Sequence, residues 1–240
     1  MKIPKKITPD RIKDAIVEIR YTSKLPFEVI PGYIFQALDD SYRYMVRPSA
    51  NFPPELSGAP IQLGSHLFHK DEIKIVLKPG SFVFNCLNSY VSWSKYLPEI
   101  DNFLKQIESS GVVEKFNRVG LRYVSIYENM DILPVLNFSF QIKLEEFSPK
   151  NMHFNSEFAY KGNTVILNIA NQEPQPTASQ KPNRLPSLSA IDIDVIKNIT
   201  VDSKDRNTLV NELETIHNIE KEIYFSLMTE EFISTLKPEY

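Results

Sequence analysis

Hydrophobic and polar residues alternate along several stretches of the chain, and this alternation predicts β-strands. The clearest case near the start is residues 14–21, where Ala15, Val17, Ile19 and Tyr21 fall on one face. A period of two residues is typical of a strand with one buried face. The same pattern predicts further strands at 72–77, 82–87, 112–127, 136–144, 154–160, 164–170 and 190–199.

Apolar residues recur at three- and four-residue steps elsewhere, which predicts helices. The strongest is residues 205–228, where Leu209, Leu213, Ile216, Ile223 and Leu227 form one apolar stripe. A helix is also expected at 33–40, with Tyr33 and Ala37 inward and Ile34 and Leu38 as further inward candidates. Another is expected from Trp93 or Ser94 to about Ser109, and a short terminal helix is capped by Thr229.

Two tight turns join pairs of predicted strands into hairpins. Lys78-Pro79-Gly80-Ser81 has proline and glycine at the central positions of a type II turn. Lys161-Gly162-Asn163 connects the strands at 154–160 and 164–170.

The predicted order of elements is β-α-β-β-α-β followed by β-β-β-β-α. This order predicts an α+β fold, with a mainly antiparallel sheet and helices packed on one side. We expect a single domain over 1–240 with two sheet-containing halves, roughly 1–130 and 131–240. A proline-rich loop is expected at 47–64 and a long Pro/Gln-rich loop at 171–189.

Composition removes several classes of protein. The 240 residues carry 27 Lys+Arg against 30 Asp+Glu and one cysteine, which excludes an internal disulfide and a cysteine-rich zinc module. The formal charge of −3 argues against a duplex-DNA binder, which is usually strongly basic. Because neither a signal peptide nor a long apolar run is present, we expect a cytoplasmic protein with no membrane partner.

Familiar catalytic motifs are absent, so we lean towards a protein that is not an enzyme. The sequence has no glycine-rich phosphate loop, no G-x-S-x-G and no H-E-x-x-H. Cys86 is expected to be a small buried residue and His217 a structural histidine. His66 and His69 could offer two imidazoles to a metal from one turn, although no cysteine or carboxylate cluster accompanies them.

Charged residues gather on the polar faces of three predicted strands. They are Glu18, Arg20, Arg118, Gly120, Arg122, Asp192 and Asp194. Arginines on either side of a glycine could hold phosphate, and the paired carboxylates Asp192 and Asp194 could hold Mg²⁺. Ordinary cross-strand ion pairs would produce the same pattern, so both interpretations stay open and no cofactor is assigned with certainty.

An aromatic and basic cluster, Tyr42-Arg43-Tyr44 with Arg47, could stack on and neutralise single-stranded nucleic acid. A transition from helix to loop explains the same residues equally well.

Several motifs together resemble a known family. They are IVEIRY (Ile16–Tyr21), R-x-G-L-R-Y (Arg118–Tyr123), I-D-I-D-V (Ile191–Val195) and a terminal helix with His217 and Phe225. In order and spacing they are similar to an uncharacterised, sporadically distributed bacterial family of about 250 residues with a Gly-Leu-Arg-Tyr core and no established activity. A patchy distribution implies a mobile genetic context, such as toxin–antitoxin or phage-defence loci.

Three functions remain as hypotheses. The first is a non-enzymatic binding or accessory protein of such a locus, with a protein partner or self-association. It is motivated by the missing motifs and by a basic start and an acidic end of the chain. The second is a metal-dependent nucleotide or phosphate-ester enzyme that uses the charged sheet face. The third is single-stranded nucleic-acid binding through Tyr42–Arg47.

Overall fold

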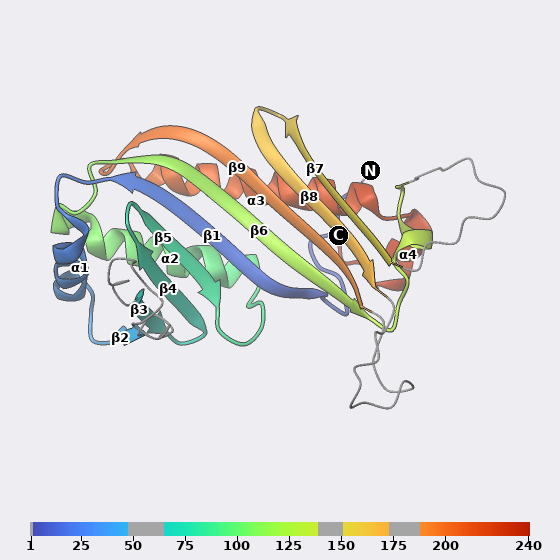
Figure 1. Ribbon diagram of the computed structural model, residues 1–240, viewed down its shortest axis with the longest axis horizontal. Helices are drawn as coiled ribbons and strands as arrows, with labels where there is room; N and C mark the ends of the chain where they lie inside the picture. Colours follow the sequence, from blue (N-terminus) through green and yellow to red (C-terminus); the bar gives the residue numbers. More distant parts are fainter. Residues whose placement is uncertain (1, 48–64, 139–150, 173–187) are drawn as a thin grey trace, which may run out of the picture. The chain divides into compact units, whose positions relative to one another are not determined.

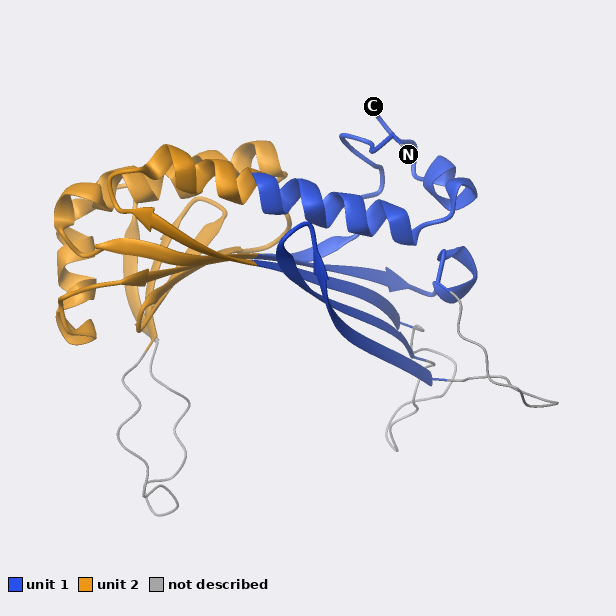
Figure 2. Ribbon diagram, turned by 90° about the horizontal axis from the view of Figure 1, so that it is seen from above, with its two compact units in different colours: residues 1–15, 121–196, 215–240 blue, residues 16–120, 197–214 orange. Residues whose placement is uncertain are grey.

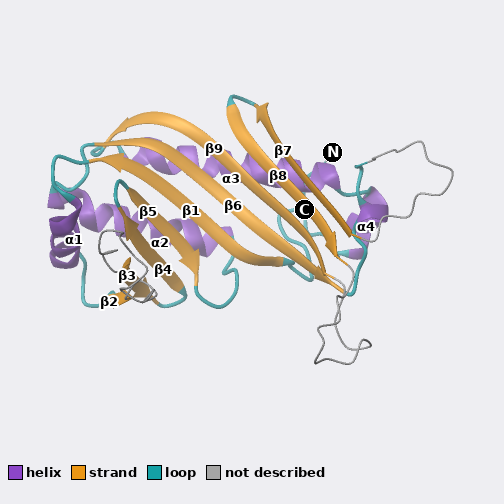
Figure 3. Cartoon of the chain, viewed as in Figure 1, coloured by secondary structure: helices purple, strands orange, loops and turns teal. Residues whose placement is uncertain are grey.

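The computed structural model describes residues 2–47, 65–138, 151–172 and 188–240 (Figure 1). It is an α+β structure with one nine-stranded antiparallel sheet, in which the strands follow the order β2-β3-β4-β5-β1-β6-β9-β8-β7 (Figure 3). The predicted fold class, a mainly antiparallel sheet with helices, is confirmed.

The strands are β1 (Ile12–Thr22), β2 (Arg43–Arg47), β3 (Ser65–Lys70), β4 (Ile73–Lys78), β5 (Ser81–Cys86), β6 (Lys115–Glu128), β7 (Asn151–Tyr160), β8 (Asn163–Gln172) and β9 (Leu188–Asp202). The helices are α1 (Ile30–Ala37), α2 (Trp93–Ile107), α3 (Arg206–Leu227) and α4 (Glu230–Thr235), with short 3₁₀ turns η1 (Phe27–Val29), η3 (Glu108–Ser110) and η4 (Leu133–Val135). None of the described helices combines the length and apolar character that crossing a bilayer requires.

The chain forms two compact units, and neither is a continuous piece of sequence (Figure 2). Unit 1 contains Met1–Ala15, Leu121–Ile196 and Thr215–Tyr240, and unit 2 contains Ile16–Gly120 and Lys197–Glu214. The boundaries therefore fall inside β1, β6, β9 and α3. The single domain and its division near residue 130 stay predictions.

Helix α2 and the strands β1, β4 and β5 supply the core of unit 2. Alternate residues of β1, including Val17 and Ile19, are fully buried, as is Ile100 of α2. The ring of Phe103 packs edge-on against those of Phe82 and Phe84, with centroids 5.5 and 5.4 Å apart. Such edge-to-face aromatic packing adds to the stabilisation from buried area.

Unit 1 follows the same principle with β8, β9 and the second part of α3. Its buried residues are Val165, Leu167 and Ile169 of β8, Ile191, Ile193 and Val195 of β9, and Ile216, Ile219 and Ile223 of α3. Because every second strand residue is buried, the sheet has one apolar and one polar face. At the end of α3, the Thr229 hydroxyl accepts a hydrogen bond from the Phe232 amide, which confirms the predicted cap of the terminal helix.

Two strands, β2 and β3, were not predicted. β2 was interpreted as a transition from helix to loop because its residues do not alternate between apolar and polar. Helix α1 begins at Ile30, three residues earlier than expected, with Pro31 in its first turn. Ile30, Pro31 and Ile34 are buried, as was considered for Ile34, whereas Tyr33, which was expected inward, is 45% exposed.

The predicted strand at 136–144 is not supported at its start. Leu136 forms only an isolated bridge with Met228, because the Asn137 amide and side chain bond to the end of α3. Residues 139–144 lie outside the described residues. Of the predicted loop at 171–189, residues 171–172 belong to β8 and 188–189 to β9, and the rest lies outside the described residues, as do residues 48–64.

The predicted turn between β4 and β5 is confirmed by its glycine. Gly80 has a φ of 69°, and its carbonyl accepts a hydrogen bond from the Tyr21 amide at 2.9 Å. A Cβ at this position would lie 3.4 Å from the Tyr21 carbonyl oxygen. The positive φ, rather than a clash, is therefore what makes glycine favourable here.

We expect Gly80→Ala to lower the free energy of unfolding by about 1 kcal/mol, because an L-residue is strained at positive φ. Gly32→Ala is the matched control. Gly32 lies in α1 with open space around it, and alanine there should raise the stability by about 0.5 kcal/mol. Urea unfolding of both variants measures the difference, and equal effects would contradict the turn assignment.

Candidate functional site

The predicted charged residues of unit 2 form a small ion-pair cluster. The Glu18 carboxylate accepts a hydrogen bond from Arg20 Nε at 3.3 Å and lies 3.5 Å from Arg118 Nη1. Glu18 and Arg118 are one-fifth to one-quarter exposed, and Arg20 is half exposed. One carboxylate thus serves two guanidinium groups.

The charged residues of unit 1 form a polar row across its strands. Arg122 donates two hydrogen bonds to Asp192, at 2.8 and 2.7 Å, which is the bidentate geometry of a strong ion pair. Asn168 also donates to Asp192 at 3.4 Å, and Asn155 donates to Asn168 at 2.6 Å. The hydrogen bonds that Arg122 donates to Asp192 raise the pKa of Arg122, and the charges of Asp194 and Asp14 add to this.

The two sets belong to different units, and each arginine has its carboxylate within its own unit. Arg118 is in unit 2 and Arg122 in unit 1, and Gly120, which is buried in β6, ends the first segment of unit 2. These contacts are the cross-strand ion pairs of the simpler interpretation. An anion or Mg²⁺ site at these residues stays a prediction, and it would have to compete with the bidentate bonds to Asp192.

Metal ligation gains no support from the described residues. No group of three or more histidine, cysteine or acidic side chains is placed to hold an ion in that part of the chain. From the sequence, His66 and His69 could share one turn, but the structure places both residues on strand β3. Three residues apart on a strand, they point to opposite faces.

Cys86 ends β5 and is partly exposed, whereas it was expected to be buried. The sequence alternation in β5 correctly predicted a strand, but the residue lies where that strand leaves the core. The structure gives it no role in a site.

Unit 1 also buries a group of polar side chains between β6 and α3. Tyr123 Oη lies 3.2 Å from His217 Nδ1, and the hydroxyls of Tyr127 and Tyr224 are 2.5 Å apart. Glu220 belongs to the same helix and is 3% exposed. His217, which was predicted to be a structural histidine, is buried and bonded to Tyr123.

Burial controls the titration of this group. It raises the pKa of Glu220 to about 8 and lowers the pKa of His217 to about 3, where the nearby Lys221 charge acts in the same direction. Burial likewise raises the pKa of Tyr224 to about 12. His217 and Glu220 are therefore both uncharged near neutral pH. All these side chains are closed to solvent, so they act as structural groups and not as a surface site.

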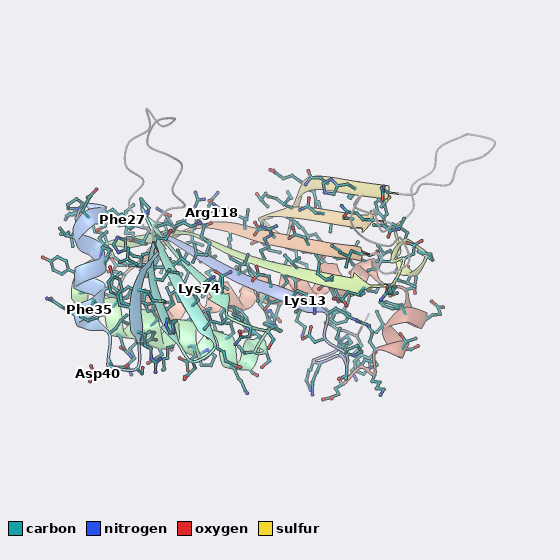
Figure 4. The ribbon with its side chains drawn as sticks, turned by 60° about the horizontal axis from the view of Figure 1, so that its bottom comes forward. Lys13, Phe27, Phe35, Asp40, Lys74 and Arg118 are labelled. Carbon is teal, nitrogen blue, oxygen red and sulfur yellow. The ribbon has the colours of Figure 1, made fainter. Side chains whose placement is uncertain are left out.

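A different surface feature stands out in unit 2. We define the edge patch as the exposed apolar residues of η1, α1 and β2. These residues are Val29, Tyr33, Phe35, Tyr44, Met45 and Val46, which are 37–57% exposed. Figure 4 shows Phe35 on α1, and its ring lies 5.8 Å from that of Tyr44 on β2.

The edge patch rests on an ordered layer of rings. Tyr44 lies 5.0 Å from the ring of Phe68, and its hydroxyl is 2.6 Å from His66 Nδ1. Phe27 packs edge-on against His66 at 5.9 Å. The patch is thus supported by ring contacts, and its outer members are exposed in the described part of the chain.

Only part of this patch was detectable in the sequence. The Tyr42–Arg47 cluster was singled out, but as a platform for nucleic-acid stacking. Tyr42 is 8% exposed, and its hydroxyl accepts a hydrogen bond from Asn102, so it cannot stack on a base. The consecutive apolar residues Tyr44, Met45 and Val46 were the available signal, because such a run exposes at least one of them on either face of a strand.

We expect Glu220→Gln to remove a pH dependence of stability. The folded protein holds the Glu220 proton up to about pH 8, whereas the unfolded chain loses it near 4.5. The stabilisation that protonated Glu220 contributes is therefore fully present below pH 4.5. It is lost as the pH rises to 8, by up to about 1.4 kcal/mol per pH unit. His217 has the opposite sign, since its contribution is lost as the pH falls from 6.5 to about 3.

The informative range is thus pH 6.5–8, where Glu220 acts without opposition from His217. Urea unfolding should show the wild-type stability falling by roughly 1–2 kcal/mol over this range, with the slope absent in Glu220→Gln. Glu157→Gln is the control, because Glu157 is exposed on β7. An unchanged slope in Glu220→Gln would show that this carboxyl stays ionised in the folded state.

A double-mutant cycle on Arg122→Gln and Asp192→Asn should give a coupling energy of about 0.5–1 kcal/mol in urea unfolding. The value is modest because Arg122 is 45% exposed, and it should fall in 1 M NaCl. A coupling near zero would instead show that this pair does not stabilise the fold and leaves both groups available to a ligand.

Comparison with known proteins supplies no further assignment. No family model matches the chain, and no curated protein matches it. The resemblance based on Arg118–Tyr123 and the other motifs stays a prediction, and the edge patch and the paired charges are the basis for inferring function.

Proposed function

We propose that this protein is a non-enzymatic binding protein that docks a partner through the edge patch. One observation carries the proposal. Of the nine large hydrophobic residues exposed in the described part of the chain, six lie between Val29 and Val46. Scattered exposed apolar residues are normal, but those that meet in space, as Phe35 and Tyr44 do with ring centroids 5.8 Å apart, mark interaction sites.

The position of β2 adds a second reason. It ends the strand order of the sheet in the described part of the chain, so one side of its backbone has no neighbouring strand there. An exposed edge strand with apolar side chains is a template for pairing with another polypeptide. Arg43–Arg47 contains no proline that would block such pairing.

The biological setting of the partner is also part of the proposal. The resemblance to a sporadically distributed bacterial family supports an accessory role in a toxin–antitoxin or phage-defence locus, in the cytoplasm. A cotranscribed gene for a toxin or a nuclease would be the first partner to test.

The alternative enzyme function has less support from the geometry. A phosphate-ester site at Arg122 and Asp192 requires these groups to exchange their mutual hydrogen bonds for substrate or Mg²⁺. Single-stranded nucleic-acid binding would depend on Tyr44, because Tyr42 is buried.

We expect the double variant Phe35→Ser/Val46→Thr to lose the proteins that co-purify with the full chain at near-physiological salt. Both residues are more than half exposed, so the fold should keep its stability. Leu188→Ser is the matched control, because Leu188 is 42% exposed but lies on β9 in unit 1. Mass spectrometry of the purified material, with a cotranscribed partner gene expressed beside the chain, measures the difference.

Light scattering on the purified chain provides the contrary outcome. If the wild type is a monomer with no bound protein, or if the double variant and Leu188→Ser retain the same partner, the edge patch is not a docking site. Unfolding curves of both variants establish that a lost partner does not reflect a lost fold.

A further inference from the structure

The register of β2 divides its surroundings into two chemically different faces. On one face, Tyr44 lies opposite Phe68 and Val46 lies opposite His66. Phe35 of α1 approaches Tyr44 on this face, so it is apolar and bounded by helix α1. A side chain added beside β2 on this face would meet aromatic and aliphatic groups.

The opposite face is basic at the Arg43 end of β2 and apolar at its centre, where Met45 lies opposite Leu67. Arg43 lies opposite His69 of β3, and His69 lies opposite Lys74 of β4, so these three residues form a row across three strands. Figure 4 shows Lys74 on the sheet. Neither Arg43 nor Lys74 has an ion-pair partner among the described residues, in contrast to Lys70, which pairs with Glu99 at 3.1 Å.

A strand that adds to β2 would have to match both faces at once. Side chains directly opposite each other on neighbouring strands share a face, and successive residues alternate between faces. The residues opposite Tyr44 and Val46 would therefore be apolar. The residue opposite Arg43 would be acidic, because opposite charges in cross-strand pairs stabilise and like charges destabilise.

We propose that the partner contributes an extended segment of alternating acidic and apolar residues, which adds as a strand to the free edge of β2. This inference rests on the proposed function and specifies the chemistry of the partner. Backbone hydrogen bonds to β2 supply affinity, and the two faces select the side chains. An acidic residue of the added strand lies beside Arg43, at the end of the row that continues through His69 to Lys74, and the apolar residues lie beside Tyr44, Val46 and Phe35.

Fluorescence anisotropy with two labelled eight-residue peptides tests the inference on the full chain. One peptide alternates valine and aspartate, and the other alternates valine and lysine. We expect the aspartate peptide to bind at least ten-fold more tightly, and to slow amide hydrogen exchange in residues 43–47. Arg43→Glu should weaken binding of the aspartate peptide by roughly ten-fold and strengthen binding of the lysine peptide.

Lys105→Glu is the matched control. Lys105 is exposed and lies on α2 rather than on β2, so this change should leave the affinities for both peptides unchanged. A proline in place of the central valine should abolish binding, since it removes a backbone donor.

Three outcomes would overturn the inference. These are equal affinity for the two peptides, binding of neither at millimolar concentration, and a dimer in light scattering that Arg43→Glu strengthens. Each is distinguishable from failure of the proposed function. If Phe35→Ser/Val46→Thr still loses its co-purifying partner while the aspartate peptide does not bind, the edge patch docks a partner by another mode.

Discussion

In β1, β4, β6, β8 and β9, every second side chain over most of the strand is removed from water, and the other features of the structure depend on this burial. A slip of one residue in the register of β8 against β9 would move Leu167 and Ile193 to the polar face. The register is therefore strongly determined, and with it the positions of the charged residues. Arg122 contacts Asp192 because both side chains lie on the polar face of the sheet, opposite the buried one.

The same constraint separates two kinds of polar group. On the open face, carboxylates such as Glu18 and Asp192 are compensated by arginines, so their charges are retained at the surface. On the buried face, Glu220 and His217 have lost their charge, because desolvation exceeds what nearby charges supply. Neither set offers an uncompensated charge at a pocket. In the described part of the chain, β2 instead has a backbone edge with no neighbouring strand, and its apolar side chains are exposed.

Periodicity in the sequence was sufficient for the strands and helices that bury a regular face, such as residues 14–21 and 205–228. It failed for β2 and β3, because apolar and polar residues do not alternate strictly in either strand. It also could not show which charged residues meet. Parity placed Glu18, Arg118, Arg122 and Asp192 on polar faces, but the pairing of strands decided that two ion-pair groups form in different units. The edge patch depends on α1 starting at Ile30, and helix boundaries of this kind are weakly encoded.

The interleaving of the two units has a consequence for synthesis on the ribosome. Most residues of unit 2 lie in Ile16–Gly120, but the unit also contains Lys197–Glu214. Unit 1 includes the later segment Thr215–Tyr240. Translation from residue 120 to 214 takes roughly 5–20 s at ordinary rates of elongation. During that interval the nascent chain carries the aromatic surface of β2 and α1 with its fold incomplete. A partner made from the same transcript could engage this surface before release, and assembly would then begin during translation.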